Sequence, residues 1–312
     1  MKRKQIQRLV QDLAHRNVVL TRAIKNTLAE LAAKLRYISN VTQLVWGVDD
    51  LEFSGIGAQW NPEEGYCAAR MVVVASEGLP LILGMAATSS KPTAYDYARA
   101  LWAGILDLQQ LTGLRGLKPT MVICDRCGIE KHQGFNLLLD EAEIILRPAK
   151  RARPYAKPGV ERAVHSTQAR LTWNREGVVM KPGDDGRFQV GMPACQLFES
   201  AKQGVREFNH EIVSGKQTRA SLYHGAFLNY GFELSEHQIA GLPRTFKDEA
   251  SIRDNVVYTN HGERFKINSQ HVVEDGPCIV YRPLFPPFNS LSVIAADAVY
   301  EALLQGEERR MT

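Results

Sequence analysis

Three acidic residues stand where metal-dependent chemistry could use them. Asp49 lies within an apolar run at 44–53, and Asp125 directly follows a second apolar run at 120–124. Glu161 lies near the start of a predicted helix, and 35 residues separate it from Asp125. Two aspartates on strands and a glutamate on a helix can converge on a pair of divalent ions, the geometry that metal-assisted phosphoryl chemistry needs. The three carboxylates are therefore candidates for one metal site.

Each acid also has a plainer interpretation. A glutamate at a helix N-terminus is commonly a favourable partner for the helix dipole and nothing more. Asp50 competes with Asp49, because alternation along a strand puts the two side chains on opposite faces. Asp49 shares its face with Leu51 and Phe53, but the pattern does not show which face holds the site. The first ligand is therefore left open between Asp49 and Asp50.

Basic and polar residues surround Glu161 in the sequence. The helix predicted from 158 to 173 carries a polar stripe on which His165 and Gln168 follow Glu161 at helical spacing. The loop before this helix is strongly basic, as is typical of a surface that binds a polyanion such as nucleic acid. The alternative is a solvated helix face. The candidate DNA contacts are Arg153, Lys157, Arg162, His165, Gln168 and Arg170.

A family resemblance rests on three motifs. They are Trp46-x-x-Asp49, Asp125 followed by Gly128 and Glu130, and Pro154-Tyr155-x-x-Pro158-Gly159-x-Glu161-Arg162. Together they resemble the D,D(35)E motif of the retroviral-integrase and bacterial-transposase superfamily, over roughly residues 41–215. A weaker resemblance at the C-terminal end is to the Mu-type transposases, which carry a small β-barrel after the core. Cys127 departs from the motif by lengthening the gap before the glycine, which bears on the local turn.

The resemblance implies a DNA transposase or integrase. Such an enzyme nicks a 3′ end of mobile-element DNA and then transfers that strand into target DNA, by in-line displacement at phosphorus. Asp49, Asp125 and Glu161 would be the catalytic residues and would hold two Mg²⁺ ions, for which Mn²⁺ is expected to substitute. Glu130 and Glu141 are alternatives to Glu161 only if the match of the preceding loop is accidental.

The resemblance also implies partners and a location. We expect the chain to bind element-end and target DNA, to act as a homo-oligomer on DNA, and to work in the bacterial cytoplasm at the nucleoid. An accessory ATPase or target-selection protein is a candidate partner. Two other functions remain open: a catalytically silent DNA-binding assembly or regulatory subunit, and an RNase H-like DNA nuclease. Metal-dependent nicking of element-end DNA separates the first of these from a transposase.

Composition is that of an ordinary globular protein with an uneven charge distribution. The 312 residues are 45% apolar and 23% charged, with a formal net charge of +4. Positive charge gathers in the first 36 residues and before Glu161. Five cysteines, an odd count, indicate a reducing compartment. With no apolar run of about 18 residues and no apolar region behind the basic N-terminus, we expect neither a membrane span nor a signal peptide.

The order of predicted elements indicates the fold. Three strands, a helix, a strand, a helix, a strand and the Glu161 helix describe an α/β RNase H-like mixed sheet flanked by helices. Period-two alternation beyond about residue 247 predicts a small all-β barrel of about five strands, with a terminal helix at 297–304. Its Arg253, Arg264, Lys266 and Arg282 are expected to contact phosphates. The predicted divisions are a basic helical segment at 1–40, the catalytic core at 41–215, a connector at 216–245 and the barrel at 246–312.

Overall fold

The computed structural model defines an α/β core and a barrel. It describes residues 44–61, 63, 65–79, 81–112, 117–125, 128–149, 158–170, 190–229, 242–260, 262–269, 272–285, 288–296, 298–305 and 310–311. The predicted basic segment at 1–40 lies outside these residues, and so do Arg153 and Lys157. None of the described helices is long and apolar enough to cross a membrane.

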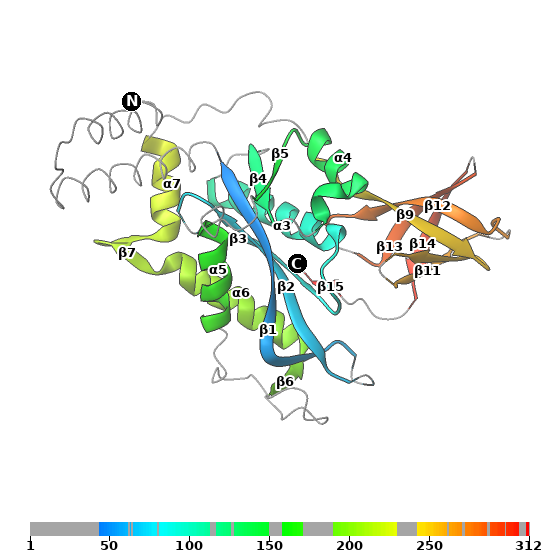
Figure 1. Ribbon diagram of the computed structural model, residues 1–312, viewed down its shortest axis with the longest axis horizontal. Helices are drawn as coiled ribbons and strands as arrows, with labels where there is room; N and C mark the ends of the chain where they lie inside the picture. The colour runs from blue at the N-terminus through cyan, green and yellow to red at the C-terminus, as the bar shows by residue number, and fades with distance from the viewer. Residues whose placement is uncertain are drawn as a thin grey trace, which may run out of the picture.

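A mixed sheet forms the centre of the core (Figure 1). Its strands are β1 (Val45–Gln59), β2 (Cys67–Ser76), β3 (Ile82–Thr88), β4 (Met121–Cys124), β5 (Ile145–Pro148), β6 (Val190–Pro193) and β15 (Arg310–Met311). The order is β15-β3-β2-β1-β4-β5, with β6 pairing farther along β1. The first three strands are antiparallel, whereas β4 runs parallel to β1 and β5 parallel to β4. This strand order is the RNase H-like fold expected from the sequence.

Helices cover both faces of the sheet, because its central strands are apolar on both sides. They are α3 (Ala94–Thr112), α4 (Gln133–Glu141), α5 (Pro158–Arg170), α6 (Ala194–His210) and α7 (Arg219–Asn229), with a 3₁₀ turn, η1 (Ile129–Lys131), before α4. One core, between the sheet and helices α3 and α4, holds Trp46 and Val48 of β1. A second core, between the sheet and helices α5 and α6, holds Leu51 and Phe53. Strand β1 therefore contributes to both cores by simple alternation.

The first residues of α3 show how the sequence sets an element boundary. Pro92 predicts the start of this helix, and the helix begins at Ala94. Thr93 and Asp96 cap one another: the Thr93 backbone N–H donates to Asp96 Oδ2 over 2.9 Å, and the Asp96 N–H donates back to Thr93 Oγ1 over 3.4 Å. Such reciprocal capping satisfies amide groups that would otherwise lack a partner in the first turn. Tyr95 and Tyr97 are thereby fixed at the start of the helix.

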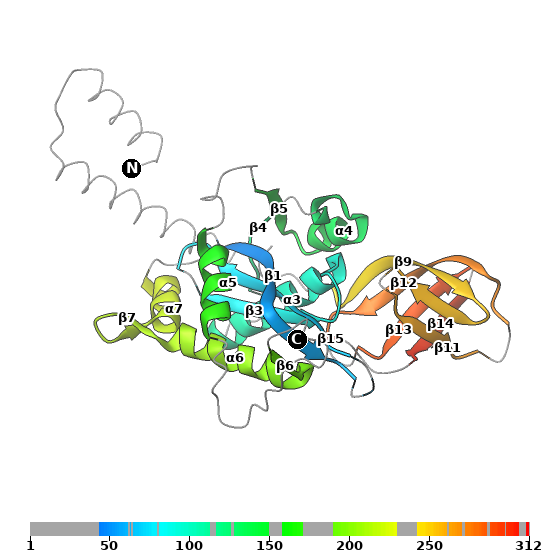
Figure 2. The same ribbon diagram turned by 60° about the horizontal axis from the view of Figure 1, so that its bottom comes forward.

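A closed antiparallel barrel follows the core. It consists of β9 (Thr245–Arg253), β10 (Val256–Thr259), β11 (Arg264–Ile267), β12 (Gly276–Pro283), β13 (Ser290–Ala295) and β14 (Ala298–Leu304). These strands close in the order β10-β11-β14-β13-β12-β9, and the barrel forms a lobe beyond α4 (Figures 1 and 2). The prediction of an all-β C-terminal barrel is confirmed. A separate hairpin, β7 (Ile212–Ser214) and β8 (Gln217–Thr218), follows α6.

Two details of the C-terminal half differ from the sequence-based expectation. The segment predicted as a terminal helix is strand β14, which pairs with β11 and β13 and supplies the sixth strand of the barrel. Its alanines and leucines favour a helix, but closing the barrel overrides that preference. Arg282, predicted to contact phosphate, is only 2% exposed. The predicted connector contains β8 and α7.

Candidate active site

The register between two parallel strands places Asp49 and Asp125 side by side. Strand β1 pairs with β4 from Val45 opposite Met121 to Val48 opposite Cys124. Continuing this register by one residue sets Asp125, which directly follows β4, next to Asp49. Asp49 is partly buried and Asp125 is exposed. One aspartate of β1 and one aspartate directly after β4 therefore follow paired strand residues.

The two neighbouring aspartates of β1 point to opposite faces of the sheet. Asp50 Oδ1 accepts a 2.5 Å hydrogen bond from the hydroxyl of Tyr97, which belongs to the core on the α3 side. Asp49 alternates with Asp50 and shares its face with Leu51, which packs in the core on the α5 side. The two aspartates are thus separated by face. Asp49 faces the layer of α5, and Asp50 is engaged by α3.

Helix α5 places Glu161 on the same face as Asp49. Val160 and Ala163 of α5 are buried in the second core, where the helix packs against β1 and β2. Glu161, between them in sequence, is exposed. Helical geometry therefore directs the two small apolar residues toward the sheet and leaves the glutamate at the rim of the contact, in the first turn of the helix.

The residues expected to contact DNA follow Glu161 along α5. Arg162 and His165 are exposed on this helix. Gln168 and Arg170 lie in its last turns, but their side chains are outside the described part of the chain, as are Arg153 and Lys157 entirely. Two exposed side chains, one cationic and one imidazole, therefore lie within one turn of Glu161.

The alternatives to Glu161 are placed differently. Glu130 Oε2 accepts a 3.0 Å hydrogen bond from the Gly128 backbone N–H, in a turn where Gly128 has a φ of 96°. This is the turn that Cys127 was expected to alter, and it requires the left-handed conformation that glycine adopts freely. Glu141 ends α4, a helix whose apolar face packs in the core on the opposite side of the sheet from α5. Of Glu130, Glu141 and Glu161, only Glu161 belongs to α5.

The donor set is suited to a hard divalent cation, because carboxylate oxygens are the ligands that Mg²⁺ prefers. Within the described ranges, no group of three or more His, Cys, Asp and Glu side chains could hold a metal ion. The assignment of Asp49, Asp125 and Glu161 as metal ligands therefore stays a prediction. What the structure provides is the adjacency of the two aspartates and the shared face of Asp49 and α5.

A cavity of about 480 Å³ lies elsewhere, against β3, α3 and α6. Asp107, Lys202 and Arg206 line it, and Leu83 and Met85 of β3 supply part of its apolar wall. Burial raises the pKa of Asp107 to about 6, and the positive charges of Lys202 and Arg206 oppose that rise. None of the three candidate ligands lines this cavity.

One buried acid was missed by sequence reasoning. Glu77 follows β2 in a segment that the sequence indicates only as a hairpin turn, yet the side chain is 5% exposed. Its carboxylate accepts hydrogen bonds from the backbone N–H groups of Gly159 and Val160 at the start of α5. These partners are 82 and 83 residues away in the chain, so no local pattern could have indicated them.

Comparisons with known proteins give only distant structural resemblances. No protein-family model matches the chain, and no curated protein does. Among solved structures, the catalytic core domain of BIV integrase matches at 14% identity and a TM-score of 0.37, over 61% of this chain and 99% of that one.

Two further solved structures resemble the chain to a similar degree. An intasome of simian T-cell lymphotropic virus matches at 14% identity and a TM-score of 0.40, over 84% of this chain and 78% of that one. The HTLV-2 integrase catalytic core domain in complex with magnesium matches at 13% identity and a TM-score of 0.35, over 58% of this chain and 97% of that one. At such identities and scores the fold assignment rests on the chain's own strand order and register.

Proposed function

We propose that this chain is a DNA transposase or integrase of the D,D(35)E type. The observation that carries the proposal is the placement of the carboxylates. Val48 of β1 and Cys124 of β4 are register partners, each is directly followed by an aspartate, and Asp49 faces the layer in which α5 carries Glu161. Convergence of strand and helix carboxylates suits in-line phosphoryl transfer, in which the protein supplies no covalent nucleophile.

The protein's part in this reaction is to supply and orient oxygen ligands. Asp49 and Asp125 would contribute them from the rigid central strands, and Glu161 from the first turn of α5. When bound, two Mg²⁺ ions supply activation of the attacking oxygen and stabilisation of the leaving oxygen, and Mn²⁺ would serve in their place. Arg162 and His165 lie within one turn of Glu161 and would hold the DNA backbone there.

The finer form of the proposal is a Mu-type transposase. The barrel that follows the core supports it, because its exposed Arg253, Arg264 and Lys266 can contact phosphates without reading sequence. The substrates would be mobile-element ends and target DNA, processed by 3′ nicking followed by strand transfer. The active form would be a homo-oligomer assembled on DNA at the bacterial nucleoid, with an accessory ATPase or target-selection protein as a further partner.

Substitution of Glu161 tests the catalytic assignment. Glu161→Gln keeps the size of the side chain and removes the charge that a metal pair requires. We expect the variant to fold and to bind element-end DNA as the parent does, while nicking and strand transfer both fall at least a hundredfold, because one site serves both displacements. Labelled element ends incubated with target DNA and Mg²⁺ provide the measurement.

A matched change on the same helix serves as the control. His165→Ala removes an exposed side chain one turn from Glu161 and should weaken DNA positioning while leaving measurable activity. Near-parental strand transfer by Glu161→Gln would remove the catalytic assignment. If the parent chain binds DNA but never nicks it, a catalytically silent assembly subunit becomes the better description. Cleavage of branched DNA or RNA–DNA hybrids without strand transfer would indicate a nuclease.

A further inference from the structure

The Glu77 carboxylate occupies an unusual position beneath the start of α5. The residue directly follows β2, and its own backbone N–H donates to the Val45 carbonyl over 2.9 Å, which fixes the turn to the first residue of β1. Its side chain is 5% exposed. A buried carboxylate is costly unless polar groups satisfy it, so its partners are expected to matter.

Both partners are backbone amides of α5. Glu77 Oε2 accepts from the Gly159 N–H over 2.9 Å, and Oε1 accepts from the Val160 N–H over 3.2 Å. The first N–H groups of a helix have no partner within the helix, and that end of the helix carries partial positive charge. One side chain therefore satisfies two such groups and places a negative charge at the favourable end of the dipole.

The fit around this carboxylate is close on both sides. A Cβ added at Gly47 would lie 2.1 Å from Glu77 Oε1, and one added at Gly159 would lie 2.3 Å from the Ser76 carbonyl oxygen. A real Cβ cannot lie so close to another atom. The contact between Glu77 and α5 therefore requires glycine at positions 47 and 159. Gly47 lies two residues before Asp49, and Gly159 lies two residues before Glu161. The carboxylate thus sits between the strand of one candidate ligand and the helix of another.

The described apolar contacts of α5 with the sheet come from few side chains. Of its described side chains, Val160 and Ala163 are buried and Val164 is partly buried against the same core. These contacts by themselves leave the depth and axial position of the helix weakly determined, because apolar contact is not directional. Two charge-assisted hydrogen bonds to consecutive amides do determine it.

We propose that Glu77 is a positioning residue for the metal site. By binding the first amides of α5, it sets where Glu161 stands relative to Asp49 and Asp125. Both of its oxygens accept from amides of α5, so we assign it an action through the helix. This inference rests on the proposed function, since it assigns to Glu77 the placement of that site's glutamate.

Glu77→Gln is the main test. It preserves the shape of the side chain, removes the charge and places an NH₂ group against one of the two N–H donors, while the amide oxygen still accepts from the other. We expect hydrogen exchange of peptides covering 158–165 to accelerate roughly tenfold or more, as loss of hydrogen bonds to a charged group implies. Strand-transfer kcat should fall about tenfold or more, KM for DNA should change little, and a higher Mg²⁺ concentration should be required.

Two further variants make the result specific. Glu199→Gln removes an equal charge from an exposed position on α6 and should leave both exchange and turnover at parental values. Gly159→Ala disturbs the same contact from the helix side while leaving the carboxylate in place, and it should reproduce the effects of Glu77→Gln. If Glu77→Gln does not fold, Gly159→Ala and Glu77→Asp carry the test, with Glu77→Asp expected to lie between the parent and the Gln variant.

The outcomes separate this inference from the proposed function. Unchanged exchange at 158–165 in Glu77→Gln would overturn the inference, and so would faster exchange with parental kcat and Mg²⁺ dependence. If the parent chain shows no strand transfer at all, the proposed function fails, while the exchange result still reports whether Glu77 holds α5.

Discussion

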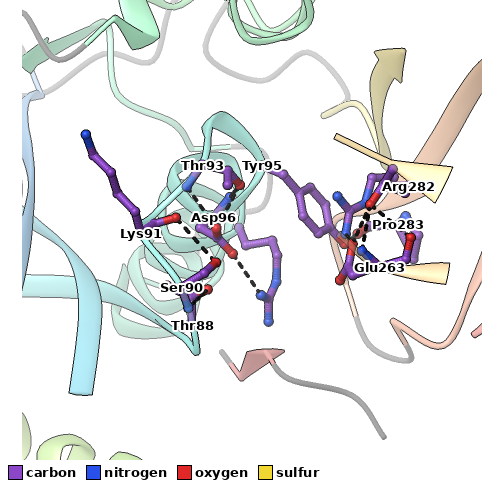
Figure 3. Close-up of polar contacts among 11 residues, drawn as sticks. Thr88, Ser90, Lys91, Thr93, Tyr95, Asp96, Glu263, Arg282 and Pro283 are labelled. Atoms are coloured by element: carbon purple, nitrogen blue, oxygen red, sulfur yellow. Dashed lines mark hydrogen bonds and ion pairs between the residues drawn. The ribbon is translucent and has the colours of Figure 1, made fainter. Parts of the chain in front are cut away.

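The barrel and helix α5 are attached to the same sheet in contrasting ways. The barrel contacts α3 through a buried cation: Arg282 of β12, which pairs with Glu263 within the barrel, stacks over the ring of Tyr95 at 3.7 Å. The Tyr95 hydroxyl donates to the Pro283 carbonyl over 2.5 Å, as Figure 3 shows. Trp102 of α3 adds a 2.8 Å hydrogen bond from its Nε1 to the Pro243 carbonyl. Many side chains thus fix the barrel to α3.

The described contacts of helix α5 with the sheet are of a different kind. Two buried apolar side chains and the Glu77 carboxylate make its described attachment to the sheet. The comparison suggests separate tests for stability and for the proposed site. Loss of a buried charged group at the junction between core and barrel should destabilise the protein, whereas loss of a contact beneath α5 should displace Glu161, a proposed ligand.

The largest effect on stability is expected at the junction. Burial lowers the pKa of the Arg282 guanidinium, and Tyr95, Asp96 and Asp248 oppose that shift by favouring its charged form. Arg282→Met leaves the partly buried Glu263 without its cation, which should lower the free energy of unfolding by about 3 kcal/mol. Urea unfolding measures this. Arg253→Met, at an exposed position on β9, is the control. A decrease of less than about 1 kcal/mol in the unfolding free energy of Arg282→Met would contradict the buried-charge description.

A smaller loss of stability with a larger loss of turnover is expected beneath α5. Gly47→Ala would bring a Cβ to within 2.1 Å of Glu77 Oε1 and 2.8 Å of Val160 Cγ1, so the helix must shift. We expect a cost of about 1–3 kcal/mol in unfolding free energy and a drop in strand transfer that exceeds the drop in DNA binding. Gly65→Ala, where a Cβ meets nothing within 4 Å, is the matched change. Equal losses of binding and turnover would break the contrast between the two attachments.

The barrel should affect DNA binding without affecting chemistry. Lys266 is exposed on β11, and its loss should weaken binding and reduce the magnitude of the slope of log K against log salt concentration by about 0.9. Strand transfer at saturating DNA should stay at the parental rate. Fluorescence anisotropy of labelled element ends over a range of salt concentrations gives the slope for Lys266→Ala. An unchanged slope would show that this surface is only solvated.

The sheet was predictable because each of its main strands is a distinct apolar run. The spacing of Asp125 and Glu161 and the strand context of the aspartates also came from sequence, and so did the barrel hairpin at 256–267. The choice between Asp49 and Asp50 could not come from alternation, since both faces of β1 are covered. It required the contact with Tyr97, 47 residues farther along the chain.

Other features could not be predicted from the sequence, because residues far away in the chain determine them. The sequence around Glu77 indicates only a turn, and its role depends on hydrogen bonds from the amides of α5. Strand β14 contains Ala298, Ala302 and two leucines, a composition typical of helices, and only its pairing partners make it a strand. Arg282 alternates like any barrel residue, and its burial follows from the contact of β12 with α3.

The pair of aspartates on β1 provides the most direct test of the central claim, that the catalytic site lies on the α5 face of the sheet. Asp49→Asn and Asp50→Asn make the same chemical change at adjacent positions on opposite faces. Asp49→Asn should lower the rate of strand transfer with Mg²⁺ at least a hundredfold below that of the parent. Asp50→Asn should keep most of the activity and lose only part of the contact with Tyr97. Loss of activity in Asp50→Asn with activity retained in Asp49→Asn would contradict the account.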